Sequence, residues 1–437
     1  MRAVYGLLTA GLLAGIAYFS GWTKAEAIGI GVFVVMAVWW ITEAVPFYIT
    51  ALLPLLSIPL LEKVSAINAA VLWQSYGSSV IGLFLGSFWL ARAVEKHGVA
   101  LFLRNWVIGR AKGKPALIIG GLMGVSALLS AFLNNTAVAA LLLTAVRQLF
   151  PPGVSRWRGG LAVVWAASLG GVLVPIGSAP NAITIELLES HGYKVSFLQW
   201  MFYGVPVTLV GLVGAYILLQ SGEKLTILSS PTSVSATLHA SGKVVMGLLG
   251  AMLMAWLLLP VPPWVVALVG AIFLFLPILP QGALLTLEEG NRIPWSILWL
   301  FGGGLALSRL MELTGLSRRL TDSLVPLLGY IPPTLWLMLI VGATLWLTEL
   351  FSNTALCSLA LPIFLPVLEK LPVSPYQAIW IGIATSMAFM LPVATPPNAL
   401  AYTLAEIPLP YMRTRGLWLN FFMMGWIWGL ILLYDLK

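Results

Sequence analysis

The chain has 437 residues, of which 60% are hydrophobic and only 9% are charged, whereas soluble proteins carry roughly 25% charged residues. This composition excludes an ordinary soluble domain and predicts an all-α polytopic membrane protein with the lipid bilayer as a partner. The net charge of +8 is no sign of a nucleic-acid partner, because Lys and Arg also mark cytoplasmic loops. The single Cys357 excludes a disulfide framework within the chain and a cysteine metal cluster.

The N-terminal apolar run covers residues 3–19 and follows Arg2. A signal peptide begins in the same way, and the small residues of "TKAEA" at 23–27 offer a cleavage site. The run is long for a signal peptide, however, and many apolar segments follow it. We therefore expect residues 1–26 to form an extra N-terminal transmembrane helix, with cleavage as the alternative.

Apolar segments of transmembrane length recur along the rest of the chain. They lie at 27–42, 47–61, 78–94, 115–133 paired with 136–150, 160–180, 200–220, 244–260, 264–280, 293–312, 333–351 paired with 354–368, 376–396 and 416–435. Two shorter stretches, at 99–110 and 315–328, are amphipathic. Residues 221–243 contain six Ser and three Thr, which is typical of a polar linker. The pattern predicts about 11 transmembrane helices.

Three motifs recur at an offset of 217 or 218 residues, which indicates an internal repeat. They are "FLGSFWLARAVEKHGV" at 84–99 with "FGGGLALSRLMELTGL" at 301–316, Asn135 with Asn353, and "SAPNAI" at 178–183 with "TPPNAL" at 395–400. We therefore predict two structural repeats, at 27–220 and 244–437, joined by a cytoplasmic linker at 221–243.

Each predicted repeat contains one apolar pair that is interrupted by Asn and Thr. We interpret the pairs at 115–150 and 333–368 as re-entrant hairpins, with full spanning as the alternative. With about five full crossings in each repeat, the second repeat is inverted relative to the first. A basic cluster beside the first hairpin places the N-terminus in the cytoplasm and the C-terminus outside. The cluster consists of Arg104, Arg110, Lys112, Lys114, Arg147, Arg156 and Arg158.

The interruption of each pair contains adjacent polar residues. It reads "AFLNNTAVAALLLT" at 131–144 and "ELFSNTALCSLALP" at 349–362. Ser, Thr and Asn are favoured helix N-caps, so each interruption would start a half-helix whose N-terminus, with about +0.5 charge equivalent, attracts an anion. The carbonyl end of the preceding half-helix suits a hard cation such as Na⁺. The alternative is that these polar residues only hold helices together.

A second helix break follows each hairpin, at "VPIGSAPNAI" (174–183) and "LPVATPPNAL" (391–400). Pro180 and the prolines at 396–397 cannot continue a helical hydrogen-bond ladder. Irregular backbone at membrane depth is tolerated where it is buried or lines a cavity. Two hairpin tips and two breaks therefore predict one central site of a secondary transporter. The polar residues available at the breaks are Ser178, Asn181, Thr395 and Asn398.

These motifs resemble those of the divalent anion/sodium symporter family, the INDY-type carriers of dicarboxylates, citrate and sulfate. The resemblance is carried by "NNT" at 134–136, "SNT" at 352–354, "LPVATPPNAL" at 391–400 and "WITEAVPFYITALLPLLSIPLL" at 40–61. It implies a homodimer in which each subunit has a fixed scaffold and a transport domain that moves like an elevator.

The resemblance also implies which residues bind the substrate and the ions. The substrate would contact Asn134, Asn135, Thr136, Ser352, Asn353, Thr354, Thr395 and Pro396. One Na⁺ site would use Ser130, Asn134, Asn135 and the carbonyl of Gly177. The other would use Thr348, the carbonyl of Phe351, Asn353 and the carbonyl of Ala394. Asn134 departs from the family, which commonly has Ser at this position.

Few charged residues lie near these motifs. Neither hairpin motif contains Lys, Arg or His, so helix N-termini, hydroxyls, amides and co-bound cations would hold the anion. Glu349 lies shortly before Asn353. It would either tune the Na⁺ site or take a proton, or it would serve as a structural partner of a hairpin N–H or another polar group, which is the interpretation we favour.

An enzyme and a channel are both disfavoured. Asp322 and Asp435 are the only Asp residues, so a buried Asp dyad is implausible, and the HExxH motif is absent. A closed midplane site in inverted repeats favours alternating access over a pore. We predict a plasma-membrane transporter that couples Na⁺ to a small divalent anion, with succinate or malate first and citrate or sulfate as further candidates. Na⁺-independent anion exchange, or transport of another ion by the same architecture, is the alternative.

Overall fold

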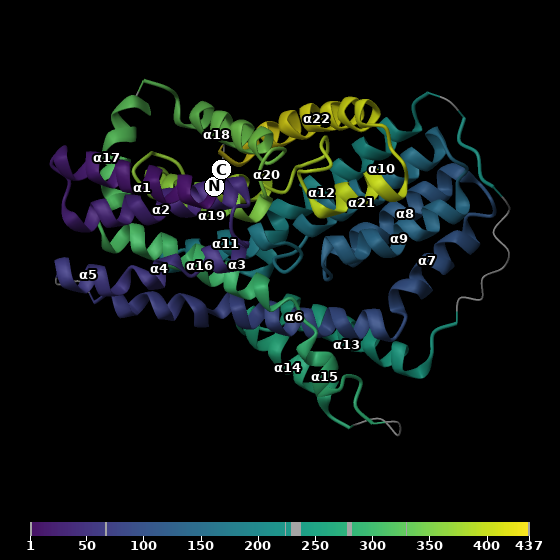
Figure 1. Ribbon diagram of the computed structural model, residues 1–437. Coiled ribbons are helices and arrows are strands. Elements are labelled where there is room, and N and C mark those ends of the chain that lie inside the picture. Colours follow the sequence, from purple (N-terminus) through teal and green to yellow (C-terminus); the bar gives the residue numbers. More distant parts are fainter. Residues whose placement is uncertain are drawn as a thin grey trace.

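Figure 1 shows the computed structural model of the chain, which describes residues 2–65, 68–222, 224–228, 237–277, 282–328 and 330–435. The regular elements within these residues are helices, so the prediction of an all-α protein is confirmed. The expected linker at 221–243 is described only in part, because 223 and 229–236 lie outside the described residues. In its described part, the N–H of Leu228 donates to the carbonyl of Leu149 at 2.9 Å.

The first half of the chain forms the helices up to α12. They are α1 (Arg2–Phe19), α2 (Lys24–Thr42), α3 (Phe47–Thr50), α4 (Leu53–Leu56), α5 (Ile58–Val64), the 3-10 helix η1 (Ala69–Gly77), α6 (Ser79–Lys96), α7 (Val99–Arg110), α8 (Pro115–Ser130), α9 (Asn135–Leu149), α10 (Val154–Val172), α11 (Ala179–Ser190) and α12 (Phe197–Gln220). The segment at 47–61, expected as one span, is divided into α3, α4 and α5. Pro54 and Pro59 each lack the N–H group that a continuous helix needs there.

The second half forms the remaining helices. They are α13 (Ala240–Leu258), α14 (Pro263–Phe275), α15 (Leu287–Asn291), α16 (Trp295–Leu313), α17 (Leu316–Leu328), α18 (Pro333–Leu347), α19 (Asn353–Leu368), the 3-10 helix η2 (Pro375–Gln377), α20 (Ala378–Ala384), α21 (Pro396–Leu404) and α22 (Leu409–Asp435). The expected span at 376–396 is wrong in its extent. Its α-helix ends at Ala384, and residues 385–395 have irregular backbone that leads into α21.

Seven helical segments among the described residues are long and apolar enough to cross a membrane. They are Lys24–Thr42, Phe47–Val64, Ala69–Lys96, Phe197–Gln220, Ala240–Leu258, Trp295–Leu313 and Leu409–Tyr434. Shorter apolar helices include most of α1 and the whole of α8, α14, α18 and α19. The chain is therefore a multi-pass membrane protein. The number of crossings, the boundaries of the two repeats and the orientation of the termini stay predictions.

The first interrupted pair, α8 and α9, forms a helical hairpin against α10. The tip of the hairpin lies at the C-terminal end of α10, where Asn135 is next to Gly171. Its base lies near the beginning of α10, where Val146 is next to Gly159, and α8 packs on the same helix. α10 is buried along almost its whole length. A half-buried pair of this kind can support a tip at membrane depth, and re-entry from one face of the bilayer stays a prediction.

The two later breaks, between α10 and α11 and between α20 and α21, are closed in the same way. In each break one Asn side chain donates to two backbone carbonyls that the break has freed. The bonds join Asn181 to Gly171 and Val174, both at 2.8 Å, and Asn398 to Ala388 and Leu391, at 3.2 and 3.1 Å. All three residues of the second set follow their counterparts at the 217-residue offset of the sequence motifs.

The two hairpins and the two breaks pack together as one cluster, in which each half of the chain contacts the other half. α9 packs against α21, and α19 packs against α11, so each hairpin contacts the helix beyond the break of the other half. Two hydrogen bonds strengthen the cluster. Thr348 donates to the carbonyl of Thr385 at 2.6 Å, and the indole of Trp165 on α10 donates to the carbonyl of Phe389 at 3.1 Å.

α6 and α16 run beside this cluster and contact each other closely. The rings of Phe84 and Phe301 meet edge to face, with centroids 4.7 Å apart. Gly86 lies so close to α14 that an added Cβ would be 2.5 Å from the carbonyl carbon of Ala267. Gly303 on α16 lies equally close to the backbone and side chain of Ala51, after α3. Glycine at these two positions therefore permits the close helix contacts of this layer.

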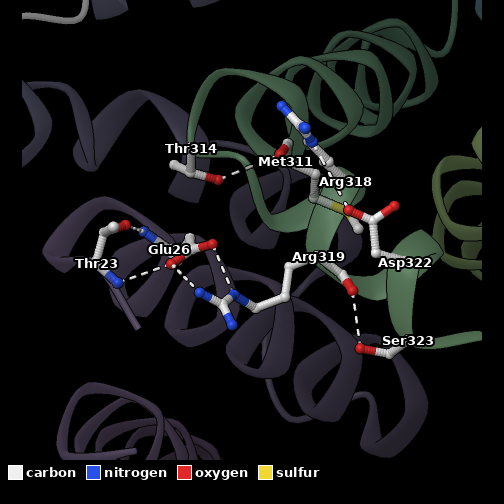
Figure 2. Close-up of polar contacts among 8 residues, drawn as sticks. All are labelled: Thr23, Glu26, Met311, Thr314, Arg318, Arg319, Asp322 and Ser323. Atoms are coloured by element: carbon white, nitrogen blue, oxygen red, sulfur yellow. Dashed lines mark hydrogen bonds and ion pairs between the residues drawn. The ribbon is translucent and has the colours of Figure 1, made fainter. Parts of the chain in front are cut away.

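An ion pair joins α2 to α17 of the other half of the chain (Figure 2). Arg319 donates to the two carboxylate oxygens of Glu26, at 2.7 and 3.3 Å. Glu26 also accepts from the N–H of Thr23, whose hydroxyl accepts from the N–H of Glu26, so the two residues form a capping box. The carboxylate of Glu26 thus caps the N-terminus of α2 and also joins this end of the helix to α17.

His191, directly after α11, joins three helix ends. Its ring nitrogens lie 2.8 Å from Glu312 on α16 and 2.9 Å from Glu369 after α19. Burial lowers the pKa of His191, but the two carboxylates outweigh burial and hold its pKa above the ordinary value of 6.5. The protonated ring is therefore a bridge between the hairpin cluster and α16.

We expect this bridge to make the stability of the protein depend on pH. Because the pKa of His191 is raised in the folded protein, its stabilisation is fully present below pH 6.5 and is lost as the pH rises through the folded-state pKa. Thermal unfolding of the purified protein should therefore show a falling melting temperature between about pH 6 and about pH 9. The variant His191→Gln should lose this part of the pH dependence, and an unchanged slope in that variant would contradict the assignment.

Candidate functional site

Two asparagines form the tip of the first hairpin. Asn134 is the N-cap of α9, and its side-chain oxygen accepts from the N–H groups of Thr136 and Ala137, at 2.9 and 3.4 Å. Ser130, at the end of α8, donates a short hydrogen bond to the side-chain oxygen of Asn135. The tip therefore has the cap that its residue types predict, and Asn135 is tied to the preceding half-helix.

The tip of the second hairpin repeats one of these features and lacks the other. Thr348, at the end of α18, donates to the side-chain oxygen of Asn353 at 2.7 Å, as Ser130 does to Asn135. Ser352 occupies the N-cap position of α19, but its side chain makes no capping hydrogen bond. The expected Ser352 cap is therefore wrong, and Ser352 is instead among the residues that line a cavity.

A cavity with a volume of about 880 Å³ lies between the two tips and the two breaks. From these elements it is lined by Asn134, Asn135, Thr136, Gly177, Phe351, Ser352, Asn353, Thr354, Ala394, Thr395 and Pro396. The structure thus brings together every residue that the sequence suggested for the substrate. Ser130 and Thr348, suggested as Na⁺ ligands, do not line the cavity. They lie behind Asn135 and Asn353, to which they are hydrogen bonded.

The opposite wall of the cavity comes from helices that the sequence analysis did not assign to the site. It contains Trp40, Ile41, Thr42, Glu43 and Phe47 around the end of α2, Phe84, Ser87 and Phe88 on α6, and Ile297, Leu300 and Phe301 on α16. Two signals were present. The motif at 40–61 and the paired motifs at 84–99 and 301–316 include most of these residues. Aromatic and aliphatic residues on a membrane helix nevertheless predict packing or lipid contact just as well.

Oxygen atoms converge beside Gly171, at the end of α10. A Cβ added to Gly171 would lie 3.0 Å from the side-chain oxygen of Asn135 and 3.3 Å from the carbonyl oxygen of Gly177. The hydroxyl of Ser130 is bonded to the same Asn135 oxygen. Neutral oxygens of this kind suit Na⁺ at an unwound helix. Among the described residues, no group of three or more His, Cys, Asp or Glu side chains offers an alternative metal site.

Glu349 supports the second break from behind the cavity. Its carboxylate accepts from the N–H groups of Phe389, Met390 and Leu391, at distances between 2.6 and 3.1 Å. It also accepts from the side-chain amide of Asn420 on α22, at 2.7 Å. Glu349 is buried and is not among the residues that line the cavity. These contacts favour a structural role, although the N–H groups belong to the break and not to the hairpin.

The cavity lining contains no Lys, Arg or His side chain, and Glu43 is its only charged residue. An anion in the cavity would therefore be held without a fixed cation. The available partners are hydroxyls, amides, the first N–H groups of α9 and α19, and cations that bind at the same time. This chemistry suits reversible binding, because a permanent cation at membrane depth is costly and resists release of the anion.

Comparison with known proteins identifies the family. The family model described as citrate transporter matches residues 37–381 and 253–434. The chain belongs to the citrate transporter family. Together with the relatives described next, this membership confirms the resemblance to divalent anion/sodium symporters and makes the protein a membrane transporter, not an enzyme.

Two curated relatives and one solved structure are similar over most of their length. The sodium-dependent dicarboxylate transporter SdcS of Staphylococcus saprophyticus is 29% identical over 440 residues, which cover 89% of this chain and 83% of that protein. SdcS of Staphylococcus aureus strain USA300 is 28% identical over 428 residues, or 88% and 81% of the two chains. The crystal structure of the Alcanivorax borkumensis YdaH transporter has a TM-score of 0.59 at 16% identity and covers 83% of this chain and 86% of its own. The last likeness supports the fold alone.

We expect Glu349→Ala to destabilise the protein strongly. The substitution leaves three backbone N–H groups and the Asn420 amide without their acceptor, and each unsatisfied buried group costs about 1–3 kcal/mol. Glu349→Gln, which keeps one acceptor oxygen, should lose less. Thermal unfolding of the purified variants measures the effect, with the exposed Glu62 on α5 changed to Ala as the matched control. Equal melting temperatures for Glu349→Ala and Glu62→Ala would contradict the structural role.

Proposed function

We propose that the protein is a secondary active transporter that couples the movement of Na⁺ to that of a small divalent anion, with a C4-dicarboxylate such as succinate or malate as substrate. The observation that carries this proposal is the cavity itself, which two hairpin tips and two helix breaks line without a cationic side chain. The SdcS relatives, which are sodium-dependent dicarboxylate transporters, support the same conclusion.

The two ends of the cavity would each hold one carboxylate of the substrate. At one end the amides and hydroxyls of Asn134, Asn135 and Thr136 meet the start of α9. At the other end the corresponding donors belong to the second tip and its neighbouring break, namely Ser352, Asn353, Thr354, Thr395 and the backbone at Pro396. A dianion with two separated carboxylates suits two helix N-termini, because each N-terminus stabilises one negative charge.

Na⁺ would bind behind each tip and complete the site. The first ion would use Ser130, Asn135 and the carbonyl of Gly177, with Asn134 adjacent. The second would use oxygens of Thr348, Phe351, Asn353 and Ala394. In both sites the Asn side chain has its oxygen on the ion side and its amide N–H groups available to the anion. Each ion thus neutralises the charge of the carboxylate that it accompanies, which couples the two movements.

The hairpin cluster would move as the transport domain, and α6, α16 and the helices packed on them would stay as the scaffold. The packing of α9 on α21 and of α19 on α11 supports a cluster that moves as one body. The cavity wall from α2, α6 and α16 would be the surface along which it slides. We further propose a plasma-membrane homodimer with a cytoplasmic N-terminus and an external C-terminus.

Uptake into vesicles tests this function. We expect purified protein in liposomes to accumulate labelled succinate when Na⁺ is outside. Labelled citrate and sulfate in the same assay rank the substrates. Equal uptake with Na⁺ and with choline would reject symport, and stimulation by internal succinate in that case would indicate anion exchange.

We expect Asn135→Ala and Asn353→Ala to weaken activation by Na⁺. Each change removes one ligand oxygen, a loss of about 1–3 kcal/mol that corresponds to roughly ten- to hundredfold. Asn135→Ala also removes the acceptor of the Ser130 hydroxyl, whereas in Asn353→Ala the Thr348 hydroxyl keeps the carbonyl of Thr385. The measurement is the Na⁺-dependent rise in melting temperature of the purified variants. Asn291→Ala, on exposed α15, is the matched control, and Asn134→Ser should be mild. An unmodified Na⁺ response in both site variants would make the tips structural only.

A further inference from the structure

Glu43 is the charged residue among those that line the cavity. It follows α2 directly and has left-handed backbone, with φ 51° and ψ 31°. This conformation is uncommon for residues other than Gly, Asn and Asp, and it costs free energy that the surrounding structure must supply. The turn is fixed on both sides, because Trp40 donates from its indole to the carbonyl of Phe47 at 3.2 Å. Glu43 is therefore held in one place by the fold.

Glu43 is among the residues that line the cavity, and it is exposed. Among the residues that the structure describes, its carboxylate has no hydrogen bond and no ion pair. The contrast with other carboxylates is clear, since several glutamates elsewhere have a basic partner within 3 Å. They are Glu26 with Arg319, Glu95 with Arg92, Glu289 with Lys96, and Glu312 with Arg309.

An unpaired carboxylate in this cavity acts on every ion that enters. It attracts Na⁺ and repels the anion, and the repulsion grows in proportion to the charge of the anion. No basic side chain of the cavity lining offsets it. Because Glu43 is exposed, water and salt screen its charge in part, and its effect is largest at low ionic strength.

We propose that Glu43 is a specificity-determining residue that concentrates Na⁺ in the cavity and disfavours anions with three negative charges relative to those with two. This inference rests on the proposed function. A carboxylate at this position selects a dicarboxylate over a tricarboxylate without any contact to the third carboxylate.

Three variants separate this role from that of a turn residue. Glu43→Gln removes the charge and keeps the length of the side chain. Glu43→Asp keeps the charge and tolerates left-handed backbone better, so it should behave like the unmodified protein. Glu62→Gln removes one charge from α5, outside the cavity lining, and controls for a change in the net charge of the protein.

The experiment measures uptake of labelled succinate and citrate in liposomes as a function of Na⁺, at low and at high ionic strength set with choline chloride. In Glu43→Gln the Na⁺ concentration for half-maximal rate should rise about threefold at low ionic strength, while the KM for succinate falls about threefold. The KM for citrate should fall further, about fivefold, because the repulsion scales with charge. All these differences should shrink at high ionic strength.

A residue that only shaped the turn would not raise the half-maximal Na⁺ concentration while lowering the KM for the anion, and it would not make both changes depend on salt. Three results would overturn the inference. In Glu43→Gln, the half-maximal Na⁺ concentration and the anion KM values change in the same direction, or the ratio of the KM for citrate to the KM for succinate stays unchanged, or the variant behaves like Glu43→Asp. Na⁺-dependent thermal stabilisation, compared with choline, gives a readout without transport. A weaker Na⁺ response in Glu43→Gln supports the inference even if the unmodified protein fails to take up succinate, whereas equal responses reject it and leave the proposed function intact.

Discussion

The structure depends on the need to satisfy backbone polar groups where helices stop inside a membrane protein. Two hairpin tips and two further breaks interrupt the ladder of helical hydrogen bonds, and every interruption frees carbonyl and N–H groups. At both later breaks a single asparagine amide serves two freed carbonyls, in matching positions of the two halves. Because these carbonyls already have hydrogen-bond partners, the other N–H groups and oxygens of the tips and breaks are available to ligands. They lie around the cavity.

The use of backbone groups and neutral side chains also explains why the site has so little charge. The cavity lining contains no basic residue, so in the proposed function the attraction for an anion would come from dipoles and from ions that arrive with it. Such a site would bind weakly when one partner is missing and strongly when all are present. Coupling between cation and anion would then be a property of the binding site itself.

The sequence predicts the parts of this design that depend on local chemistry. Asn134 caps a helix because of its residue type, and prolines place the breaks at 174–183 and 391–400. It does not predict features that depend on distant neighbours. Ser352 does not cap although its type favours it, and it is instead among the residues that line the cavity. The wall from α6 and α16 follows from tertiary packing that periodicity does not encode, whereas the division of 47–61 into three helices follows from Pro54 and Pro59.

Glu349 has a consequence for how the protein is made. Its carboxylate is completed by the N–H groups of 389–391 and by Asn420, which lies 71 residues later in the chain. At ~5–20 residues per second, the ribosome needs roughly 4 to 14 s to synthesise that partner. Until then the carboxylate lacks the Asn420 amide, so its full set of hydrogen bonds can form only after this part of α22 has been made.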